Sequence, residues 1–470
     1  MNTAELFLRN ADREAVAAHF EDRSYTYREL ATESLRRAAL WDALRRPDRP
    51  PHIGVLLDNT AGYAEALTAA DHERPWDAAA DDDLFLLIFT SGSTGFPKAV
   101  RCTQGRFART GMHVARVAAL GSGSVVYAPL PFFHTSALFT GLASALHASG
   151  AIGSRARFSA SRTMPDIHRM GATMLTYTGK VLNYILAAPT SPDDATSPLQ
   201  LAMGNEASES DIREFAARFH CQVRDSYGST EGMIIIRRDE TMPGGSLGRG
   251  DDTIAVHDPE TGRECPRADF DGDGRLLNAE AAIGEIVNTN PGDGFEGYYR
   301  NEEALASKVR NGVYWSGDLA YRDVDGWFFF AGRSNEWLRV DGENFAAGPV
   351  EAIVMRYRDV RSASVFAVPD DPVGDRVMVA IEVADLDTFD LDAFDAFLAQ
   401  QGDLGPKWVP SFVRITDELP KLASMKIDKT RLRREGWLAP DTSWRPARGE
   451  ELRPLDAEHL EDLAHLLESR

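Results

Sequence analysis

A loop rich in glycine and hydroxyl side chains follows a short apolar run near residue 90. Residues 84–89 read LFLLIF, and residues 90–98 read TSGSTGFPK. A short apolar run that ends at such a loop is typical of a buried strand. Backbone N–H groups of small residues can approach phosphate oxygens closely, and Lys98 adds a positive charge. Because the GxxxxGK[ST] spacing is absent, the pattern indicates a phosphate-binding loop different from the P-loop; a flexible connector is the ordinary alternative.

The segments around this loop alternate between strand-like and helix-like patterns. The run at 84–89, the loop and a helix-like stretch at 105–120 form a strand, loop and helix, and further strands are expected at 125–130 and at the start of 174–186. This alternation predicts an α/β fold with largely parallel sheets. Beyond Gly244, short strands separated by turn dipeptides such as DG and NG predict an antiparallel or β-barrel-like subdomain.

The pattern changes again near residue 333. Helix-like segments at 349–358 and 391–401, with apolar strands between and around them, predict a small α+β domain. We therefore predict an N-terminal domain over residues 1–332, a hinge over 333–336 and a C-terminal domain over 337–470 that ends in a helical tail.

Composition and charge exclude several classes of protein. The net charge of −21 over 470 residues argues against a nucleic-acid groove, which needs a positive surface. The chain has 3 cysteines without metal-ligand spacing, so we expect no disulfide framework and a cytoplasmic location. The N-terminus lacks the apolar core of a signal peptide, and no run approaches the roughly 20 apolar residues of a membrane span. Peripheral membrane contact and a homodimer are compatible with this sequence.

Further segments carry recognisable motifs. They are VVYAPLPFFH ending at His134, GNE at 204–206, YGSTEG at 227–232, YWSGD at 314–318, the stretch 332–345, and LPKLASMK ending at Lys426. Together with the loop at 90–98 they resemble, in the same order, the motifs of the adenylate-forming superfamily of acyl-CoA synthetases, luciferases and peptide-synthetase adenylation domains. The resemblance covers residues 83–434. Several motifs in one order are far more specific than any one of them.

The resemblance implies an ATP site. An aromatic ring at Tyr227 can stack on a base, and the carboxylate of Asp318 can accept hydrogen bonds from both ribose hydroxyls. The residues implied are Thr90, Ser91, Gly92, Ser93, Thr94, Gly95 and Lys98 for the phosphates, Gly204, Asn205, Glu206, Tyr227 and Gly228 for the adenine, and Asp318 and Arg333 for the ribose and α-phosphate; Gly342 belongs to the implied CoA loop.

The resemblance also implies four catalytic residues. Glu231 offers the hard oxygen that Mg²⁺ requires, and Thr230 can hydrogen-bond a phosphate. His134 would line the acyl pocket. Lys426 would neutralise the negative charge that builds up when a carboxylate attacks the α-phosphorus. Taken alone, each has an ordinary structural explanation, such as a core position for His134 or a solvated basic stretch around Lys426.

These assignments predict an ATP-dependent acid:CoA ligase that works through an acyl-adenylate, using ATP, Mg²⁺ and coenzyme A. Within the superfamily the chain is most similar to the fatty-acid transport protein and very-long-chain acyl-CoA synthetase branch, which implies a long-chain fatty or steroid side-chain acid. The resemblance also implies that the C-terminal domain is mobile and turns between half-reactions. The alternatives are an acyl-AMP ligase that delivers to a carrier protein and a non-catalytic lipid-binding or uptake protein of the same fold.

One segment departs from the superfamily pattern. Between Leu67 and Asp81 relatives carry a longer stretch with another α/β unit, whereas this chain passes through AADHERPWDAAADDD near residues 70–71. Either that unit has been lost, or the numbering runs on across absent residues. We favour the second interpretation because losing sheet strands would expose long edges and apolar helix faces.

Overall fold

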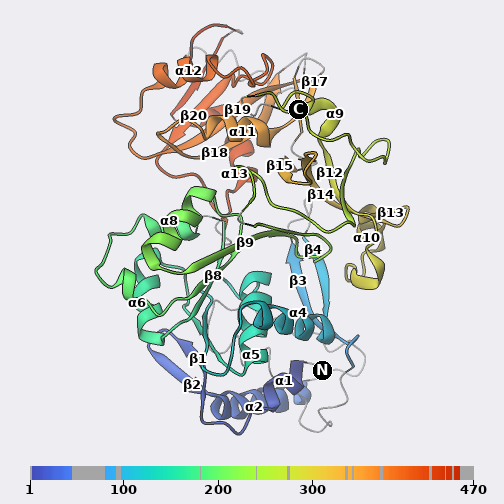
Figure 1. Ribbon diagram of the computed structural model, residues 1–470, viewed down its shortest axis with the longest axis vertical. Coiled ribbons are helices and arrows are strands. Elements are labelled where there is room, and N and C mark those ends of the chain that lie inside the picture. Colours follow the sequence, from blue (N-terminus) through green and yellow to red (C-terminus); the bar gives the residue numbers. More distant parts are fainter. Residues whose placement is uncertain are drawn as a thin grey trace. The chain divides into compact units, whose positions relative to one another are not determined.

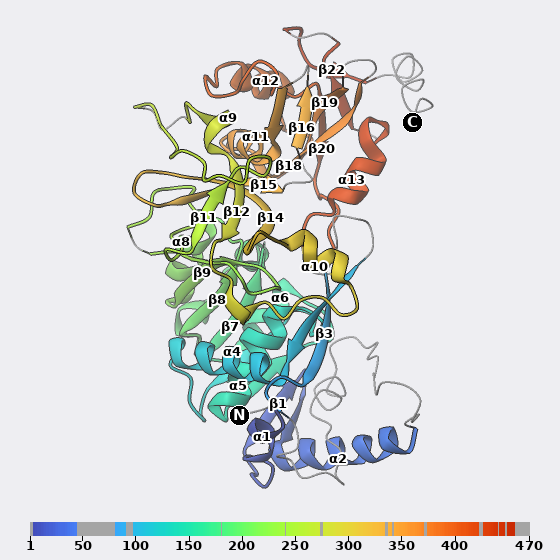
Figure 2. The ribbon, with the colours of Figure 1, turned by 90° about the vertical axis from the view of Figure 1, so that its right-hand side faces the viewer.

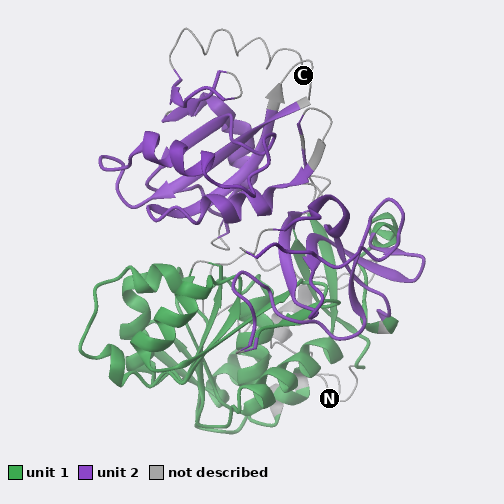
Figure 3. Cartoon of the chain, turned by 45° about the horizontal axis from the view of Figure 1, so that its top comes forward, with its two compact units in different colours: residues 1–238, 292–307, 423–425 green, residues 239–291, 308–422, 426–470 purple. Residues whose placement is uncertain are grey.

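The computed structural model describes residues 3–44, 80–90, 97–179, 181–239, 241–272, 276–333, 337–340, 343–370, 374–422, 426–439, 441–446 and 449–455. The chain divides into two compact units (Figure 3): residues 1–238, 292–307 and 423–425 form the first, and residues 239–291, 308–422 and 426–470 form the second. The short segment near residue 70, hinge residues 334–336 and the tail beyond residue 455 lie outside the described residues, and the boundary at residue 332 stays a prediction. None of the helices in the described ranges is long and apolar enough to cross a membrane.

An eight-stranded sheet forms the centre of the first unit (Figure 1). Its spatial order is β10-β9-β8-β7-β5-β6-β1-β2. Neighbours from β9 to β1 are parallel, and β10 and β2 are antiparallel edge strands. The strands are β1 (Val16–Phe20), β2 (Arg23–Thr26), β5 (Val125–Tyr127), β6 (Ala151–Ser154), β7 (Met174–Thr178), β8 (Leu201–Asn205), β9 (Gln222–Gly228) and β10 (Ile235–Arg237). The predicted α/β class with a parallel sheet is confirmed.

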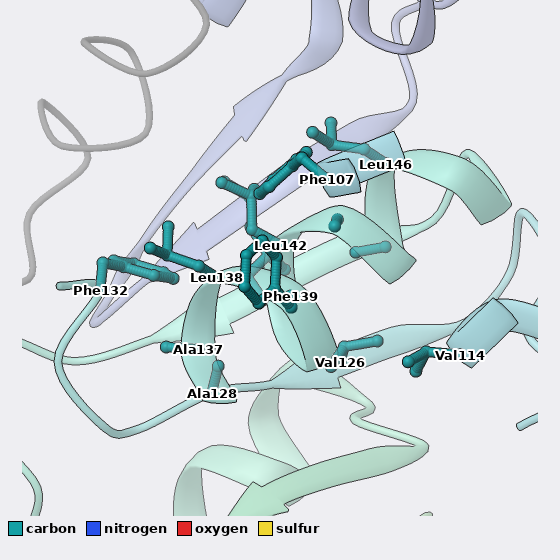
Figure 4. Close-up of a cluster of buried hydrophobic side chains, with 14 of the residues drawn as sticks. Phe107, Val114, Val126, Ala128, Phe132, Ala137, Leu138, Phe139, Leu142 and Leu146 are labelled. Carbon is teal, nitrogen blue, oxygen red and sulfur yellow. The ribbon is translucent and has the colours of Figure 1, made fainter. Parts of the chain in front are cut away.

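Helices cover both faces of this sheet, because successive strand residues point to opposite sides. Val126 packs in one apolar cluster with α4, η2 and α5, whereas its neighbour Tyr127 packs in another with α6, α7 and α8. Figure 4 shows Phe107 of α4 and Phe139 of the π-helix η2 in the first cluster. The helices are α1 (Thr3–Leu8), α2 (Tyr27–Leu44), α4 (Gln104–Val117), η2 (Ser136–Ala143), α5 (Ser144–Ala148), α6 (Ala160–Met170), α7 (Val181–Leu186), the 3₁₀ turn η3 (Asp194–Thr196) and α8 (Glu209–Phe219).

The predicted strand, loop and helix at 84–120 needs a correction. The loop at 91–96 joins two antiparallel strands, β3 (Leu84–Thr90) and β4 (Lys98–Thr103), which form a separate two-stranded sheet before α4 begins. The mixture of polar and apolar residues in KAVRCT suits a half-buried strand. The edge of β4 that does not pair with β3 forms hydrogen bonds with a segment far along the chain. The N–H of Arg101 donates to the Gly297 carbonyl at 3.1 Å, and that of Tyr299 to the Ala99 carbonyl at 2.8 Å.

The second unit contains two sheets. The antiparallel five-stranded sheet consists of β11 (Ile254–His257), β12 (Gly284–Asn288), β13 (Val309–Arg310), β14 (Val313–Arg322) and β15 (Phe328–Arg333), beside the short helix α9 (Ala279–Ala282). The seven-stranded sheet consists of β16 (Trp337–Val340), β17 (Glu343–Ala346), β18 (Val360–Asp370), β19 (Gly374–Val383), β20 (Phe412–Thr416), β21 (Thr442–Trp444) and β22 (Arg453–Pro454). The short antiparallel strands expected beyond Gly244 and the later α+β pattern are both present.

Helices also lie on both faces of the seven-stranded sheet (Figure 2). Helices α11 (Ala347–Val354) and α12 (Leu391–Ala399) pack on one face, in a cluster with Val379 and Val413. Helix α13 (Lys429–Glu435) packs on the other, in a cluster with Met378 and Phe412. The two helices predicted at 349–358 and 391–401 correspond to α11 and α12, which end a few residues earlier than the sequence pattern.

Candidate functional site

The predicted adenine residues lie at the carboxyl ends of β8 and β9. These ends meet at one edge of the parallel sheet, which is where ligands bind in open α/β folds. Gly204 leaves no room for a side chain, since a Cβ there would lie 2.2 Å from the Tyr177 carbonyl oxygen. Glu206 follows with a positive φ of 66°. The backbone of residues 204–206 is therefore pressed against β7 and turns sharply at the sheet edge.

A buried polar cluster, which motif matching did not predict, anchors this turn. Its centre is Asp225 of β9, whose Oδ2 accepts hydrogen bonds from the Tyr177 hydroxyl at 2.9 Å and from the Ala207 N–H at 3.0 Å. The Arg238 guanidinium forms an ion pair with the other carboxylate oxygen at 3.1 Å. Tyr177 and Asp225 are 0% and 8% exposed. Asp225 thus joins three neighbouring elements directly behind the predicted adenine turn.

The buried Asp225 carboxyl should leave a signature in the pH dependence of stability. Burial raises its pKa from 3.8 to about 6, although Arg238, the Ala207 N–H and Tyr177 act in the opposite direction. Between these two pH values the folded protein binds a proton that the unfolded chain releases, so this group favours the folded state more as the pH falls. We expect the free energy of unfolding of the wild type, minus that of Asp225→Asn, to increase by up to about 3 kcal/mol between pH 7 and pH 4.

Urea denaturation of both proteins at half-unit pH steps measures this difference. Subtracting the two curves removes the titration of every other group that the substitution leaves unchanged. A difference that stays flat, or that decreases on acidification, would contradict the assignment.

A second cluster joins the phosphate-loop hairpin to the predicted metal ligand. The Tyr298 hydroxyl donates to Glu231 Oε1 at 2.8 Å, and the Lys98 ammonium lies 5.6 Å from the centroid of the Tyr298 ring. Tyr298 is 6% exposed and is bridged to Val100 of β4. Burial and the neighbouring Glu231 carboxylate both raise the pKa of the Tyr298 hydroxyl, which keeps it a proton donor. The structure therefore brings Lys98 and Glu231 together through a tyrosine absent from the predicted site.

Helix α4 holds the turn that carries Thr230 and Glu231. The Arg106 guanidinium donates to the Thr230 carbonyl oxygen and, at 2.9 Å, to the Arg101 carbonyl oxygen. Arg106 also lies over the Phe139 ring, at 5.5 Å from its centroid. Gly232, with a φ of 76°, lets the chain turn beside this guanidinium. Arg106 is a second supporting residue that the motifs did not predict.

Two buried polar atoms lie at the edges of this region. Within the described part of the chain, Asn205 Oδ1 and Ser229 Oγ have no hydrogen-bond partner. Buried polar atoms are usually satisfied by protein, water or ligand. Asn205 ends β8 and Ser229 follows β9, so both atoms lie in the segments predicted to bind the nucleotide.

Asp318 and Arg333, predicted at the ribose, are neighbours in the second unit. They face each other across β14 and β15, and the Arg333 Nε lies 3.4 Å from Asp318 Oδ1. Asp318 is the more protected of the two, with 18% of its side chain exposed against 48% for Arg333. The ion pair places a carboxylate beside a guanidinium, two groups that can recognise hydroxyl and phosphate groups.

Lys426 lies in a turn within the second unit. The Leu422 N–H donates to the Lys426 carbonyl oxygen at 2.8 Å. Lys421 forms ion pairs with Glu382 at 3.5 Å and with Glu418 at 3.3 Å, and Lys429 forms one with Glu351 at 3.0 Å. The neighbouring lysines therefore have structural roles, which argues against a uniformly solvated basic stretch.

The remaining predicted residues are placed as follows. His134 begins the turn into η2, where its carbonyl accepts from the Leu138 N–H at 3.1 Å. Thr90 and Lys98 face each other at the base of the hairpin, and the Thr90 hydroxyl lies 3.5 Å from the Lys98 carbonyl oxygen. Ser91, Gly92, Ser93, Thr94, Gly95 and Gly342 lie outside the described residues.

Comparisons with known proteins show the family of this chain. A family model for AMP-binding enzymes matches residues 64–299, and one for the AMP-binding enzyme C-terminal domain matches residues 349–426. The medium/long-chain-fatty-acid–CoA ligase FadD17 of Mycobacterium marinum is 43% identical over 472 residues, covering 87% of this chain and 91% of that protein. Steroid-22-oyl-CoA synthetase of Rhodococcus jostii is 44% identical over 396 residues, covering 83% and 71%.

The fold has solved counterparts. ATP-bound MatB from Rhodopseudomonas palustris has a TM-score of 0.74 and 21% identity, covering 92% of this chain and 99% of that one, which shows the fold alone. The AMP-binding family model alone covers half of the chain. The chain belongs to the AMP-binding enzyme family, as its motif series predicted. It is similar both to a fatty-acid ligase and to a steroid ligase, the two kinds of bacterial relative that the resemblance named.

Proposed function

We propose that this protein is an ATP-dependent acid:CoA ligase that converts a long-chain fatty or steroid side-chain carboxylic acid to its CoA thioester through an acyl-adenylate. The observation that carries the proposal is the cluster of Lys98, Tyr298 and Glu231 at the base of the glycine-rich hairpin, in a chain of the AMP-binding enzyme family. The substrate class rests on the relatives named as fatty-acid and steroid CoA ligases.

The residues divide the work of adenylation. Lys98 and the hairpin bind the phosphates of ATP, Tyr227 and the turn at 204–206 bind the adenine, and Asp318 with Arg333 binds the ribose. The substrate carboxylate attacks the α-phosphorus and pyrophosphate leaves. Lys426 stabilises the negative charge of the transition state. In the second half-reaction the CoA thiolate displaces AMP from the acyl-adenylate, with the segment around Gly342 near the thiol.

The donor set around Glu231 fits Mg²⁺ bound together with a nucleotide. The described residues contain no group of three or more His, Cys, Asp or Glu side chains that could hold a metal by themselves. Mg²⁺ commonly uses one or two carboxylates and completes its octahedron with phosphate oxygens and water. Glu231 would supply the carboxylate, and the metal would neutralise charge on the phosphates.

Replacing Tyr298 by phenylalanine should weaken this arrangement without removing the ligand. The substitution deletes the hydroxyl that donates to Glu231, so the carboxylate loses one orienting hydrogen bond. A hydrogen bond to a charged group contributes about 1.5 to 3 kcal/mol, so we expect about tenfold more Mg²⁺ to be needed for half-maximal ATP binding. Calorimetric titration of ATP at several Mg²⁺ concentrations, without acid, measures this. Tyr299→Phe is the matched control, and an equal effect there would contradict the assignment.

A single incubation series tests the proposed function. Protein, ATP and Mg²⁺ are mixed with fatty, aromatic and steroid acids, with and without CoA, and the products are analysed by mass spectrometry. Acyl-CoA from fatty or steroid acids is expected. Acyl-AMP that accumulates without thioester would favour the acyl-AMP ligase that serves a carrier protein. Absence of pyrophosphate release with every acid would favour the non-catalytic lipid-binding protein.

We also propose that the protein is cytoplasmic, that it contacts membranes peripherally and that it forms a homodimer. Sedimentation with phospholipid vesicles and size-exclusion chromatography with light scattering test the last two directly.

A further inference from the structure

Asp318 lies in a bulge of β14. Strands β12 and β14 pair through Glu285 with Leu319 and through Val287 with Trp315, so three residues of β14 oppose only Ile286 of β12. These three residues, Ser316, Gly317 and Asp318, form what we call the 316–318 bulge. Bulges bend a strand and redirect its side chains, and they are frequent beside active sites. The direction in which the Asp318 carboxylate points thus depends on the contacts that stabilise this bulge.

Side chains satisfy the backbone groups that the bulge removes from the strand ladder. The Gly317 N–H donates to Glu285 Oε1 at 2.5 Å, and the Lys308 ammonium donates to the Ser316 carbonyl oxygen. The Asp318 N–H donates to the Ser316 hydroxyl at 3.0 Å. Gly317 has a φ of 84°, which favours glycine. The backbone of Ser316 and that of Gly317 are therefore each tied to a charged side chain from another element.

Glu285 is an unusual residue for the middle of a strand. It is 5% exposed, and burial raises the pKa of its carboxyl, as does the nearby Asp318, while the Gly317 N–H, Lys308 and Arg310 lower it. The Arg310 guanidinium lies 3.6 Å from its Oε2. Burying a carboxylate is costly unless hydrogen bonds and cations compensate, and an apolar residue would pack a strand more cheaply. Here the Gly317 N–H and the cations of Lys308 and Arg310 compensate for the burial of the Glu285 carboxylate.

We propose that Glu285, together with Lys308, is a positioning residue that sets the 316–318 bulge and so aims the Asp318 carboxylate at the ribose hydroxyls. The inference rests on the proposed role of Asp318 in ATP binding. Among the described residues, the Glu285 carboxylate accepts from the Gly317 N–H and lies beside the Lys308 and Arg310 cations. Its contribution to nucleotide affinity should therefore pass entirely through Asp318.

Comparing nucleotides with and without ribose hydroxyls tests whether Glu285 acts through Asp318. Calorimetry with ATP and with 2′,3′-dideoxy-ATP is carried out on the wild type, Glu285→Ala, Glu285→Gln and Lys308→Met. We expect Glu285→Ala to weaken ATP binding about tenfold, the effect of one misplaced charge-assisted hydrogen bond, and to leave dideoxy-ATP binding within about twofold. Glu285→Gln should be closer to the wild type, because its amide oxygen can still accept from Gly317. Lys308→Met should cause the same loss of affinity for ATP only. If Glu285→Ala does not fold, Lys308→Met tests the proposal in its place.

Two further variants separate the possible failures. Asp318→Asn should also lose affinity for ATP only, and adding Glu285→Ala to it should cause no further loss. If Asp318→Asn binds ATP like the wild type, the proposed ribose role of Asp318 is wrong. If Asp318→Asn is weakened but Glu285→Ala and Lys308→Met are not, or if they weaken both nucleotides equally, the positioning role is wrong.

A matched control accounts for general effects of losing a buried acid. Asp194 is 6% exposed, accepts from the Ser191 N–H at 3.0 Å and pairs with Arg218 at 2.8 Å; it precedes the amino end of β8, whereas the predicted adenine turn follows the carboxyl end of that strand. Asp194→Asn should lower the melting temperature and leave the affinity for ATP unchanged. A loss of ATP affinity in this control equal to that of Glu285→Ala would overturn the inference.

Discussion

Replacing Lys426 by alanine will slow adenylation by about 10² to 10³-fold, the range found on removing one transition-state donor. Attack of the carboxylate places extra negative charge on the α-phosphoryl oxygens, and only an interaction that strengthens in this transition state accelerates the step. Thioester formation from supplied acyl-adenylate should suffer much less, since the CoA thiol attacks the acyl carbon and no pentavalent phosphorus forms in this half-reaction. The two half-reactions therefore separate a catalytic lysine from one that merely supports the fold.

Pyrophosphate release measures the first half-reaction, and acyl-CoA formed from synthetic acyl-adenylate measures the second. Lys429→Ala is the matched control, because Lys429 belongs to the same basic stretch but forms an ion pair with Glu351 at 3.0 Å. We expect the control to lose some thermal stability and to keep its adenylation rate within a few-fold. Equal losses in both half-reactions of Lys426→Ala would show that our assignment is wrong.

Replacing Glu231 by glutamine will reduce adenylation by about 10²-fold at a fixed, low Mg²⁺ concentration. A metal that neutralises phosphate charge contributes several kcal/mol to the transition state, and each 1.36 kcal/mol is a factor of ten. Glutamine keeps the size of the side chain and can still accept the hydrogen bond that Tyr298 donates at 2.8 Å. The turn at 229–232 should therefore persist while the charged ligand is lost.

Initial rates over a series of Mg²⁺ concentrations test this prediction, and thermal melting checks the fold. The loss should shrink as Mg²⁺ increases, and it should exceed that of Tyr298→Phe, which retains the carboxylate. Glu296→Gln is the control, because Glu296 holds Thr103 through its N–H at 2.8 Å and its hydroxyl at 2.6 Å rather than facing the nucleotide. A 10²-fold loss that does not depend on Mg²⁺ would rule out a metal ligand at Glu231.

Two contiguous segments of the predicted site lie side by side in the structure. The turn at 204–206 and the motif at 227–232 were predicted from adjacent letters, and the parallel sheet brings them to one edge because β8 and β9 are neighbours. The alternation of apolar runs with helical segments sufficed for the α/β class. It left the strand at KAVRCT unassigned between the loop and the helix, since a six-residue half-buried strand is too short for its period to stand out.

Local patterns and their order were enough to predict the family and the α/β class and to propose the site residues that the motifs contain. The residues that support this site could be found only in the folded chain. Tyr298 reaches Glu231 across 67 positions, and Tyr177 reaches Asp225 across 48. Glu285 reaches the bulge at Asp318 because β12 pairs with β14. No local period signals such contacts: they form where strand order and register bring distant polar groups into a buried place, and burial then requires that each find a partner. Strand β4, which follows the glycine-rich segment, is likewise bonded along one edge to residues 297 and 299, far along the chain.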